Sequence, residues 1–366
     1  MQIKELTYIN HITGWNIRNM NFNELTLLVG ASGVGKTQIL KSILSLVRVA
    51  NGRSLNGVEW SIKFAIDKNQ YEWSGCFDQL DSIEHTLFVD RIEVPIRYEF
   101  LRINNSVLVH RNGVKVIYRE KETIKLDSNK SVIELLKEEL DIMPVYQSFR
   151  RIYKLNTDRQ GVRISPIKNV EEKRPTLQEI KLGTRLSLVE KLFVLRKFNF
   201  PEFTQIKETF IDIFPSVQDI DFATVSLYDD TTAQILKIKE RGVDSWIEQS
   251  DISSGMYRAL MQIIALNLSV DGDVMLIDEF ENGLGINCID ILADYILNPD
   301  MDIQIIMTSH HPYIINSIPV NRWNIVTRHI SDIRIYTASE LNIGQRSHHD
   351  AFMQLLQTSQ FKTGDK

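Results

Sequence analysis

Apolar and polar residues alternate along the first third of the chain in the short runs that predict β-strands. Residues 1–10 carry apolar side chains at Ile3, Leu6 and Tyr8, as a half-buried strand would, and Asn16 to Phe22 predicts a second strand. Further β-rich runs follow between residues 60 and 126, with the sequences SIKFAI, HTLFV, EVPIRYEF, VLVH and VKVIY. The dipeptide Asn112-Gly113 separates the last two runs and is the strongest short hairpin signal. This part of the chain is therefore predicted to be an antiparallel β region.

The spacing of apolar residues changes to a helical period in the middle of the chain. Residues 132–140 predict an amphipathic helix that ends at Pro144, and the polar stretch 166–175 predicts a loop. From residue 176 to residue 214 apolar side chains recur three or four positions apart, and Pro201 separates two helices. No heptad array is sustained, so a long coiled-coil arm is not expected.

The last third alternates between strand and helix patterns. Residues 223–227 and 233–239 predict two strands joined by a polar turn, and residues 260–268 predict an apolar helix. Residues 273–279 and 303–310 are apolar strands that each end in polar side chains. Buried strands of this kind, each ending in a polar residue, fit a parallel sheet that binds its ligand at the carboxyl edge.

A third apolar strand, residues 25–29, leads into the sequence G-x-x-x-x-G-K-T and then into a helix. This is a phosphate-binding loop in the strand–loop–helix context that the motif requires. Its glycines permit positive φ, and its backbone amides and the helix N-terminus point positive charge at phosphate groups. Lys36 is expected to reach the β- and γ-phosphates of ATP, and the Thr37 hydroxyl is expected to ligate Mg2+. The expected nucleotide contacts are Gly30, Ala31, Ser32, Gly33, Val34, Gly35, Lys36, Thr37 and Gln38.

Two adjacent carboxylates end the strand at residues 273–279. Asp278 is suited to hold Mg2+, and Glu279, on the other side of the strand, is suited to orient and deprotonate a water molecule. A lone Asp-Glu pair is often only a surface turn, but here it shares the chain with a phosphate loop. His310 is expected to contact the γ-phosphate or to hold the water, although the neighbouring His311 leaves the choice of histidine open.

Ser254 and Gly255 open the apolar helix and form a second candidate anion site. The simpler alternative is an ordinary N-cap, because serine is a preferred capping residue. If the pair serves the same nucleotide as the phosphate loop, it comes from a second subunit. Asn282 and Gly283 follow the carboxylates in a turn that would link the two sites of such a dimer.

Composition changes this picture little. The net charge of -5 argues against a generally basic nucleic-acid binder, although basic residues between Arg91 and Arg119 form either a basic face or, mixed with acidic residues, a solvated one. Cys76 and Cys288 lack metal-site spacing and are expected to be buried apolar residues of a reducing compartment. Trp15 either stacks on adenine or belongs to the core or surface. With no membrane-spanning run and no signal peptide, the expected location is cytoplasmic.

The order of these motifs resembles ABC-type ATPase heads, the class that contains SMC proteins, RecF and the overcoming-lysogenization-defect (OLD) ATPases. The sequence looks closer still to stand-alone AAA-domain ATPases of bacterial anti-phage systems, the PtuA-like and OLD-like groups. Those groups carry DE-x-E-N-G/x-L and T-[ST]-H-x-P, matched here by residues 278–284 and 308–312. Ser32 stands where many relatives have Asn, and no Toprim-like acidic set follows residue 320. The glutamine that senses Mg2+ in such heads is not evident, and Gln147 is a candidate by position alone.

The resemblance implies an α/β fold, an ABC-ATPase-like P-loop NTPase head with an N-terminal antiparallel β region, a parallel core sheet and an inserted helical region. The expected division is an N-terminal lobe at 1–130, an inserted region at 131–222 and a C-terminal lobe at 223–366. The implied function is a Mg2+-dependent ATPase that forms a homodimer or higher homo-oligomer around ATP and controls an effector protein encoded nearby, as in anti-phage defence. The alternatives are a DNA-repair clamp of the RecF or SMC type, which would bind nucleic acid, and a phosphotransferase. Glu279 and the Ser254 motif disfavour the phosphotransferase.

Overall fold

A computed structural model of the chain describes residues 1–80, 93–155, 174–183, 186–226, 232–297, 301–344 and 348–358. The chain divides into two compact units. The sheet unit contains residues 1–154, 272–280 and 302–366, and the helical unit contains residues 155–271 and 281–301. The chain passes between the two units four times, so neither unit is continuous in sequence.

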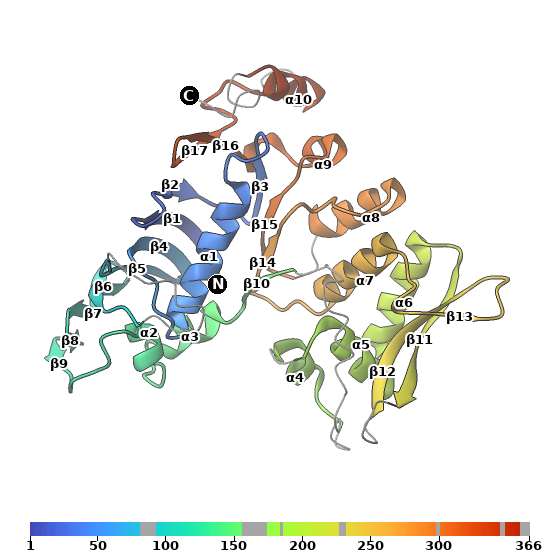
Figure 1. Ribbon diagram of the computed structural model, residues 1–366, viewed down its shortest axis with the longest axis horizontal. Helices are drawn as coiled ribbons and strands as arrows, with labels where there is room; N and C mark the ends of the chain where they lie inside the picture. Colours follow the sequence, from blue (N-terminus) through green and yellow to red (C-terminus); the bar gives the residue numbers. More distant parts are fainter. Residues whose placement is uncertain are drawn as a thin grey trace. The chain divides into compact units, whose positions relative to one another are not determined.

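The described residues of the sheet unit form one fourteen-stranded mixed sheet, with strand order β10-β14-β15-β3-β16-β17-β2-β1-β4-β5-β6-β7-β8-β9 (Figure 1). The strands that are near each other in sequence are β1 (Gln2–Asn10), β2 (Asn16–Asn21), β3 (Leu25–Val29), β4 (Val58–Ile66), β5 (Asn69–Phe77), β6 (Ile96–Ile103), β7 (Ser106–Asn112), β8 (Lys115–Tyr118) and β9 (Lys121–Glu122). The later strands are β10 (Ile152–Lys154), β14 (Val274–Ile277), β15 (Gln304–Thr308), β16 (Trp323–His329) and β17 (Asp332–Thr337).

Five of these strands, β10, β14, β15, β3 and β16, pair in parallel. Every side chain of β14 and β15 is buried, as expected for strands covered on both faces. The three apolar runs predicted to form a parallel sheet, residues 25–29, 273–279 and 303–310, are therefore neighbours in the order β14-β15-β3. Their carboxyl ends meet at one edge of the sheet, which confirms the predicted α/β class.

The remaining strands pair antiparallel except for β17 and β2, which pair in parallel, and helices cover one face of this antiparallel region. In β4 the residues Val58, Trp60, Ile62 and Phe64 alternate with more exposed positions and face the core. Helix α1 (Lys36–Ala50) buries Ile39, Leu40, Ile43 and Leu46 at helical spacing and runs along the sheet in Figure 1. Phe149 of helix α3 (Met143–Phe149) packs edge-on against Trp73 and Phe64, with ring centroids 5.1 and 5.5 Å apart. A single hydrophobic core thus joins the antiparallel region to α1.

Two sequence predictions near residue 140 are wrong. The predicted helix 132–140 is the single turn α2 (Val132–Leu135), and Pro144 does not end a helix but begins α3 (Met143–Phe149). Proline suits the first turn of a helix, where its missing N–H leaves no bond unmade. Leu140, counted as part of the apolar stripe, is 78% exposed. Gln147 lies exposed on α3, and its role in sensing Mg2+ stays a prediction.

The other predictions in this region are mostly confirmed. The predicted hairpin joins β7 to β8, with Asn112 paired to Lys115 and Gly113 at φ 56°. Strand β5 was not predicted, and the run HTLFV lies outside the described residues.

The helical unit contains helices α4 (Leu177–Leu182), α5 (Leu188–Lys197), α6 (Pro201–Ile213), α7 (Ser254–Asn267) and α8 (Ile286–Leu297). Helix α7 lies among α5, α6 and α8 (Figure 1). A small antiparallel sheet of β11 (Val217–Ser226), β12 (Thr232–Glu240) and β13 (Trp246–Glu248) completes the described part of this unit. The helices predicted over residues 176–214 and the break at Pro201 are confirmed. Residues 166–173 of the predicted loop, residue 227 of the predicted strand and residues 229–231 of the predicted turn lie outside the described residues.

The chain returns to the sheet unit at residue 302, and the segment that follows β15 stays in that unit. It contains α9 (Pro312–Ser317), the 3-10 helix η1 (Val320–Arg322) and α10 (His348–Gln357). Both cysteines are buried and neither forms a disulfide, and burial raises the pKa of the Cys76 and Cys288 thiols. They are the small buried residues that the sequence predicted.

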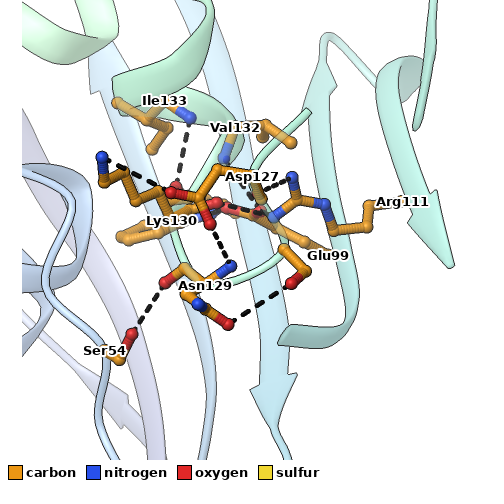
Figure 2. A network of polar contacts seen from close by, with 11 residues as sticks. Ser54, Glu99, Arg111, Asp127, Asn129, Lys130, Val132 and Ile133 are labelled. Atoms are coloured by element: carbon orange, nitrogen blue, oxygen red, sulfur yellow. Dashed lines mark hydrogen bonds and ion pairs between the residues drawn. The ribbon is translucent and has the colours of Figure 1, made fainter. Parts of the chain in front are cut away.

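A buried ion pair joins the antiparallel strands to α2 (Figure 2). Glu99 of β6 and Arg111 of β7 are both fully buried, with 3.6 Å between the guanidinium nitrogen and the carboxylate oxygen. The carboxylate also accepts hydrogen bonds from the Trp73 indole, the Ser131 hydroxyl and the Val132 amide. Burial raises the pKa of Glu99, and the charge of Arg111 opposes that rise.

The guanidinium of Arg111 binds backbone as well as Glu99. It donates to the carbonyls of Lys130 and Asp127, at 2.6 and 2.9 Å, in the segment that leads into α2 (Figure 2). Ser131, which donates to Glu99, also caps α2 by accepting from the Ile133 amide. The pair therefore fixes where α2 begins.

Most of the other basic residues of this region pair with acidic residues on the surface. The ion pairs are Arg97–Asp78, Arg102–Glu72, Lys115–Glu122 and Arg119–Asp141. Arg91 lies outside the described residues. The described part of this sheet therefore carries mixed charge, which favours the solvated face over a basic nucleic-acid surface.

Candidate functional site

The phosphate loop follows β3 and ends where α1 begins. A Cβ atom at Gly30 would lie 2.3 Å from the carbonyl oxygen of Val326 in the neighbouring strand β16, so only glycine fits there. Gly35, the N-cap of α1, has φ 106°, and a Cβ there would lie 2.6 Å from Ile333. At these two glycines the backbone of the phosphate loop therefore lies in close contact with the sheet.

The Lys36 side chain folds back over this loop. Lys36 is only 6% exposed, and its ammonium donates to the carbonyls of Gly30 and Ala31, at 2.8 Å each. The Val34 side chain is buried in the core, so this residue offers only backbone to a ligand, whereas Ser32 and Gly33 are exposed. Gln38 is half-buried on the first turn of α1. The ammonium and the helix N-terminus together form a site suited to an anion.

Asp278, directly after β14, lies against this loop. Its Oδ1 accepts hydrogen bonds from Thr37 Oγ1 at 3.0 Å and from Thr308 Oγ1 at 3.1 Å. Its Oδ2 is 3.0 Å from the Lys154 ammonium. Thr37 and Asp278 fit a Mg2+ ion, because two adjacent ligands of an octahedral ion with bonds of 2.0–2.1 Å lie about 2.9 Å apart. Within the described residues no cluster of three or more His, Cys, Asp or Glu side chains forms another metal site.

Glu279 occupies a turn held by Thr308. Its amide donates to Thr308 Oγ1 at 2.7 Å, and the Phe280 amide donates to the Thr308 carbonyl at 3.0 Å. The backbone of Glu279 has φ 51°, a left-handed conformation that is uncommon for a residue other than glycine. Its side chain is exposed at the same sheet edge as Asp278. Because the surrounding bonds fix this unfavourable conformation, Glu279 differs from a residue of an unconstrained surface turn.

The two histidines after β15 have different surroundings. His310 is exposed at the carboxyl edge of β15, after the buried Ser309. His311 is partly buried, and its Nδ1 has no hydrogen-bond partner among the residues that the structure describes. Its amide donates to Ser309 Oγ at 3.1 Å, and α9 begins at the next residue. The more accessible of the two is therefore His310, the residue proposed from the sequence.

Ser254 and Gly255 open α7 in the helical unit. The N-cap is Ser253, whose hydroxyl accepts from the Met256 amide at 3.2 Å, so Ser254 is not the capping residue. Ser254 is exposed in the first turn. A Cβ at Gly255 would lie 2.8 Å from the Gly283 carbonyl, so this helix start packs closely on the turn after Glu281. The glycine therefore has a packing role inside the helical unit.

Arg328, Trp15 and Lys154 also lie beside the phosphate loop or the carboxylates. Arg328, near the end of β16, donates to the Gly33 carbonyl at 3.3 Å and stacks 4.7 Å from the Trp15 ring centroid. Trp15 itself would be 3.3 Å from a Cβ at Gly35, so it belongs to the loop surroundings. Arg328 was not predicted from the sequence, although the run NIVT before it repeats the pattern of the three predicted strands. Lys154, which ends a strand of three residues, was not predicted either.

Comparison with known families agrees with this geometry. A family model described as "AAA domain, putative AbiEii toxin, Type IV TA system" matches residues 25–316, most of the chain. The chain belongs to this AAA-domain family. The match begins at β3 and includes the phosphate loop, the carboxylates and His310. No curated protein matches the sequence of this AAA domain.

Three of the solved structures that align with the chain are heads of SMC proteins. The AAA domain aligns with an SMC head bound to the C-terminal winged-helix domain of ScpA, at a TM-score of 0.53 and 14% identity over 92% of this chain and 97% of that chain. A Pyrococcus furiosus SMC head bound to the ScpA C-terminal domain aligns at 0.49 and 13% identity, covering 93% and 97%. The Thermotoga maritima SMC head aligns at 0.43 and 13%, covering 92% and 99%. The first of these shows the fold, that of an SMC-head P-loop ATPase. Among the described residues, no helix has the length and apolar character needed to cross a membrane.

Proposed function

We propose that this AAA domain binds and hydrolyses ATP with Mg2+ and that ATP joins two copies into a dimer that controls a partner protein. One observation carries the ATPase assignment. Thr37, at the end of the phosphate loop, contacts Asp278, at the end of another strand, across 3.0 Å. A phosphate loop and a strand-end carboxylate brought together in this way are the parts that P-loop ATPases use to hold a nucleotide and its metal.

In this proposal each residue of the site has its own role in binding ATP or in hydrolysis. Lys36 and the loop amides bind the phosphates, and Thr37 and Asp278 hold Mg2+, which neutralises phosphate charge. Glu279 orients a water molecule and accepts its proton. His310 contacts the γ-phosphate or holds the water. The exposed position of Glu279 and His310 at one sheet edge supports these roles.

The proposal of a dimer is based on the second candidate anion site, formed by Ser254 and Gly255. Ser254 is exposed at the start of α7 and leaves the capping bond to Ser253. A phosphate-facing helix start in addition to the phosphate loop is redundant within one chain. It is useful if it completes the nucleotide site of another copy, with two ATP molecules at the interface.

The proposed partner is an effector such as a nuclease or toxin, in anti-phage defence. The family description names a toxin and a toxin–antitoxin system, which suits a chain that acts together with another protein. The SMC head that shares this fold is described as bound to a domain of ScpA. A domain with this fold is therefore suited to bind a partner protein whose activity depends on ATP binding.

The ATPase assignment predicts that Lys36→Ala weakens ATP binding by roughly tenfold to a hundredfold, because a charged hydrogen bond to phosphate is lost. The measurement is a titration with fluorescent ATP. Lys137→Ala, which removes an exposed lysine paired with Glu134, is the matched control and should bind as the parent does. Undiminished ATP binding by Lys36→Ala contradicts the assignment.

The dimer predicts that Ser254→Arg impairs ATP-dependent dimerisation and turnover while nucleotide binding by the monomer stays nearly intact. The added bulk and charge would meet the other copy's γ-phosphate. Ser216→Arg, at an exposed serine of the same unit, is the control and should dimerise normally. The readout is the mass in solution with and without ATP.

Mixing Lys36→Ala chains with Ser254→Arg chains gives a sharper test of the shared site. In the mixed dimer one composite site carries both substitutions and the other carries neither. Some ATPase activity should therefore reappear, provided that one intact site turns over alone. A protein that stays monomeric at saturating ATP, even as Glu279→Gln, would refute the shared site.

A further inference from the structure

Lys154 contacts Asp278, the carboxylate that is proposed to bind Mg2+. Its ammonium lies 3.0 Å from Asp278 Oδ2, whereas the two threonine hydroxyls, of Thr37 and Thr308, bind Oδ1. Both oxygens of Asp278 are thus engaged, one by a positive charge. The Asp278 side chain is largely buried, being 13% exposed, so the ion pair lies mostly out of solvent.

The contact is built by the sheet. Lys154 is the last residue of β10, which pairs in parallel with β14 in the register Lys154–Leu276. Asp278 follows β14 by one residue, so the two side chains meet at the carboxyl edge. Lys154 is also the last residue before the chain enters the helical unit.

We propose that the Lys154 ammonium, paired with Oδ2 of Asp278, competes with Mg2+ for this carboxylate and that Mg2+ displaces the ammonium when a nucleotide binds. The proposal rests on the proposed function, because it takes Thr37 and Asp278 as the metal ligands. An ammonium and a Mg2+ ion at the same carboxylate repel each other, so one leaves as the other arrives.

Lys154 and Mg2+ therefore compete for Asp278, and the effect of Mg2+ on nucleotide affinity measures this competition. In the parent protein Mg2+ must break an existing ion pair, which reduces the amount by which Mg2+ tightens nucleotide binding. Lys154→Met removes the competing cation and retains the length of the side chain. Mg2+ should then tighten nucleotide binding by a larger factor.

The experiment measures the dissociation constant of fluorescent ADP in Mg2+ and in EDTA for the full chain. The ratio of the EDTA value to the Mg2+ value should rise on the order of tenfold in Lys154→Met, the lower end for a charged hydrogen bond because Lys154 is 39% exposed. Lys154→Arg should keep the parent ratio. Lys63→Met is the matched control, because Lys63 on β4 pairs with Glu5 at the same 3.0 Å.

The other outcomes are decisive. If both dissociation constants rise equally, Lys154 binds phosphate and the proposal is overturned. If neither changes, the ion pair plays no part in metal binding and the proposal is again overturned. If the parent binds ADP in neither buffer, the proposed function itself fails, whatever Lys154 does.

Discussion

Glu279→Gln is expected to slow ATP hydrolysis on the order of a hundredfold or more while ATP stays bound, the usual scale for the loss of a general base. Glutamine keeps the shape and the hydrogen-bonding capacity of the side chain but cannot accept the proton of the attacking water. The left-handed turn should survive, because its bonds to Thr308 come from backbone amides rather than from the Glu279 carboxylate.

Single-turnover hydrolysis and an ATP titration on the same protein separate chemistry from binding. The matched control is Glu24→Gln. It makes the same change at an exposed glutamate directly before β3, at the amino end of that strand. That variant should hydrolyse ATP at the parent rate. Normal turnover by Glu279→Gln would leave Glu279 as a turn residue only.

Arg111→Met is expected to lower the free energy of unfolding of the sheet unit by about 3–5 kcal/mol. The substitution leaves the fully buried carboxylate of Glu99 without its charge partner and removes two bonds to the segment that leads into α2. Trp73 donates to the same carboxylate, so tryptophan fluorescence during urea unfolding reports on this region.

Arg102→Met is the control, because Arg102 on β6 pairs with Glu72 at the partly exposed surface. Exposed pairs contribute about 0–1 kcal/mol, so the midpoint should hardly move. The double variant Glu99→Leu with Arg111→Met should be more stable than Arg111→Met alone, because no uncompensated charge remains in the core. Equal losses for the two arginine variants would show that the buried pair contributes no more than a surface pair.

The parts of the site that sequence alone revealed are those whose residues are adjacent in the chain. The phosphate loop needs eight consecutive positions, and the carboxylates directly follow an apolar run, so their local pattern determined the prediction. Lys154 and Arg328 were missed because their relevance comes from strand pairing. Lys154 meets Asp278 through the pairing of β10 with β14, and Arg328 meets Gly33 through the pairing of β16 with β3. No periodicity within either segment encodes those neighbours.

The helix errors have a similar cause. The pattern at residues 132–140 is helical in period, but Leu140 has no core to pack on and is exposed. Tertiary contacts, above all the bonds of Ser131 and Val132 to Glu99, decided where that helix begins. At α7 the pattern located the helix correctly, and only the coordinates distinguish the capping serine, Ser253, from Ser254.

The central position of β3 determines when the chain can fold as the ribosome makes it. Both of its neighbours, β15 and β16, are synthesised long after it. At about 5–20 residues per second, the roughly 280 residues between Leu27 and its partner Met307 take roughly 14 to 56 s to synthesise. During that time an apolar strand with two unpaired edges is available to other nascent chains. A truncated chain that stops before β15 therefore lacks both strands that flank the nucleotide loop and is a substrate for chaperones rather than a smaller ATPase.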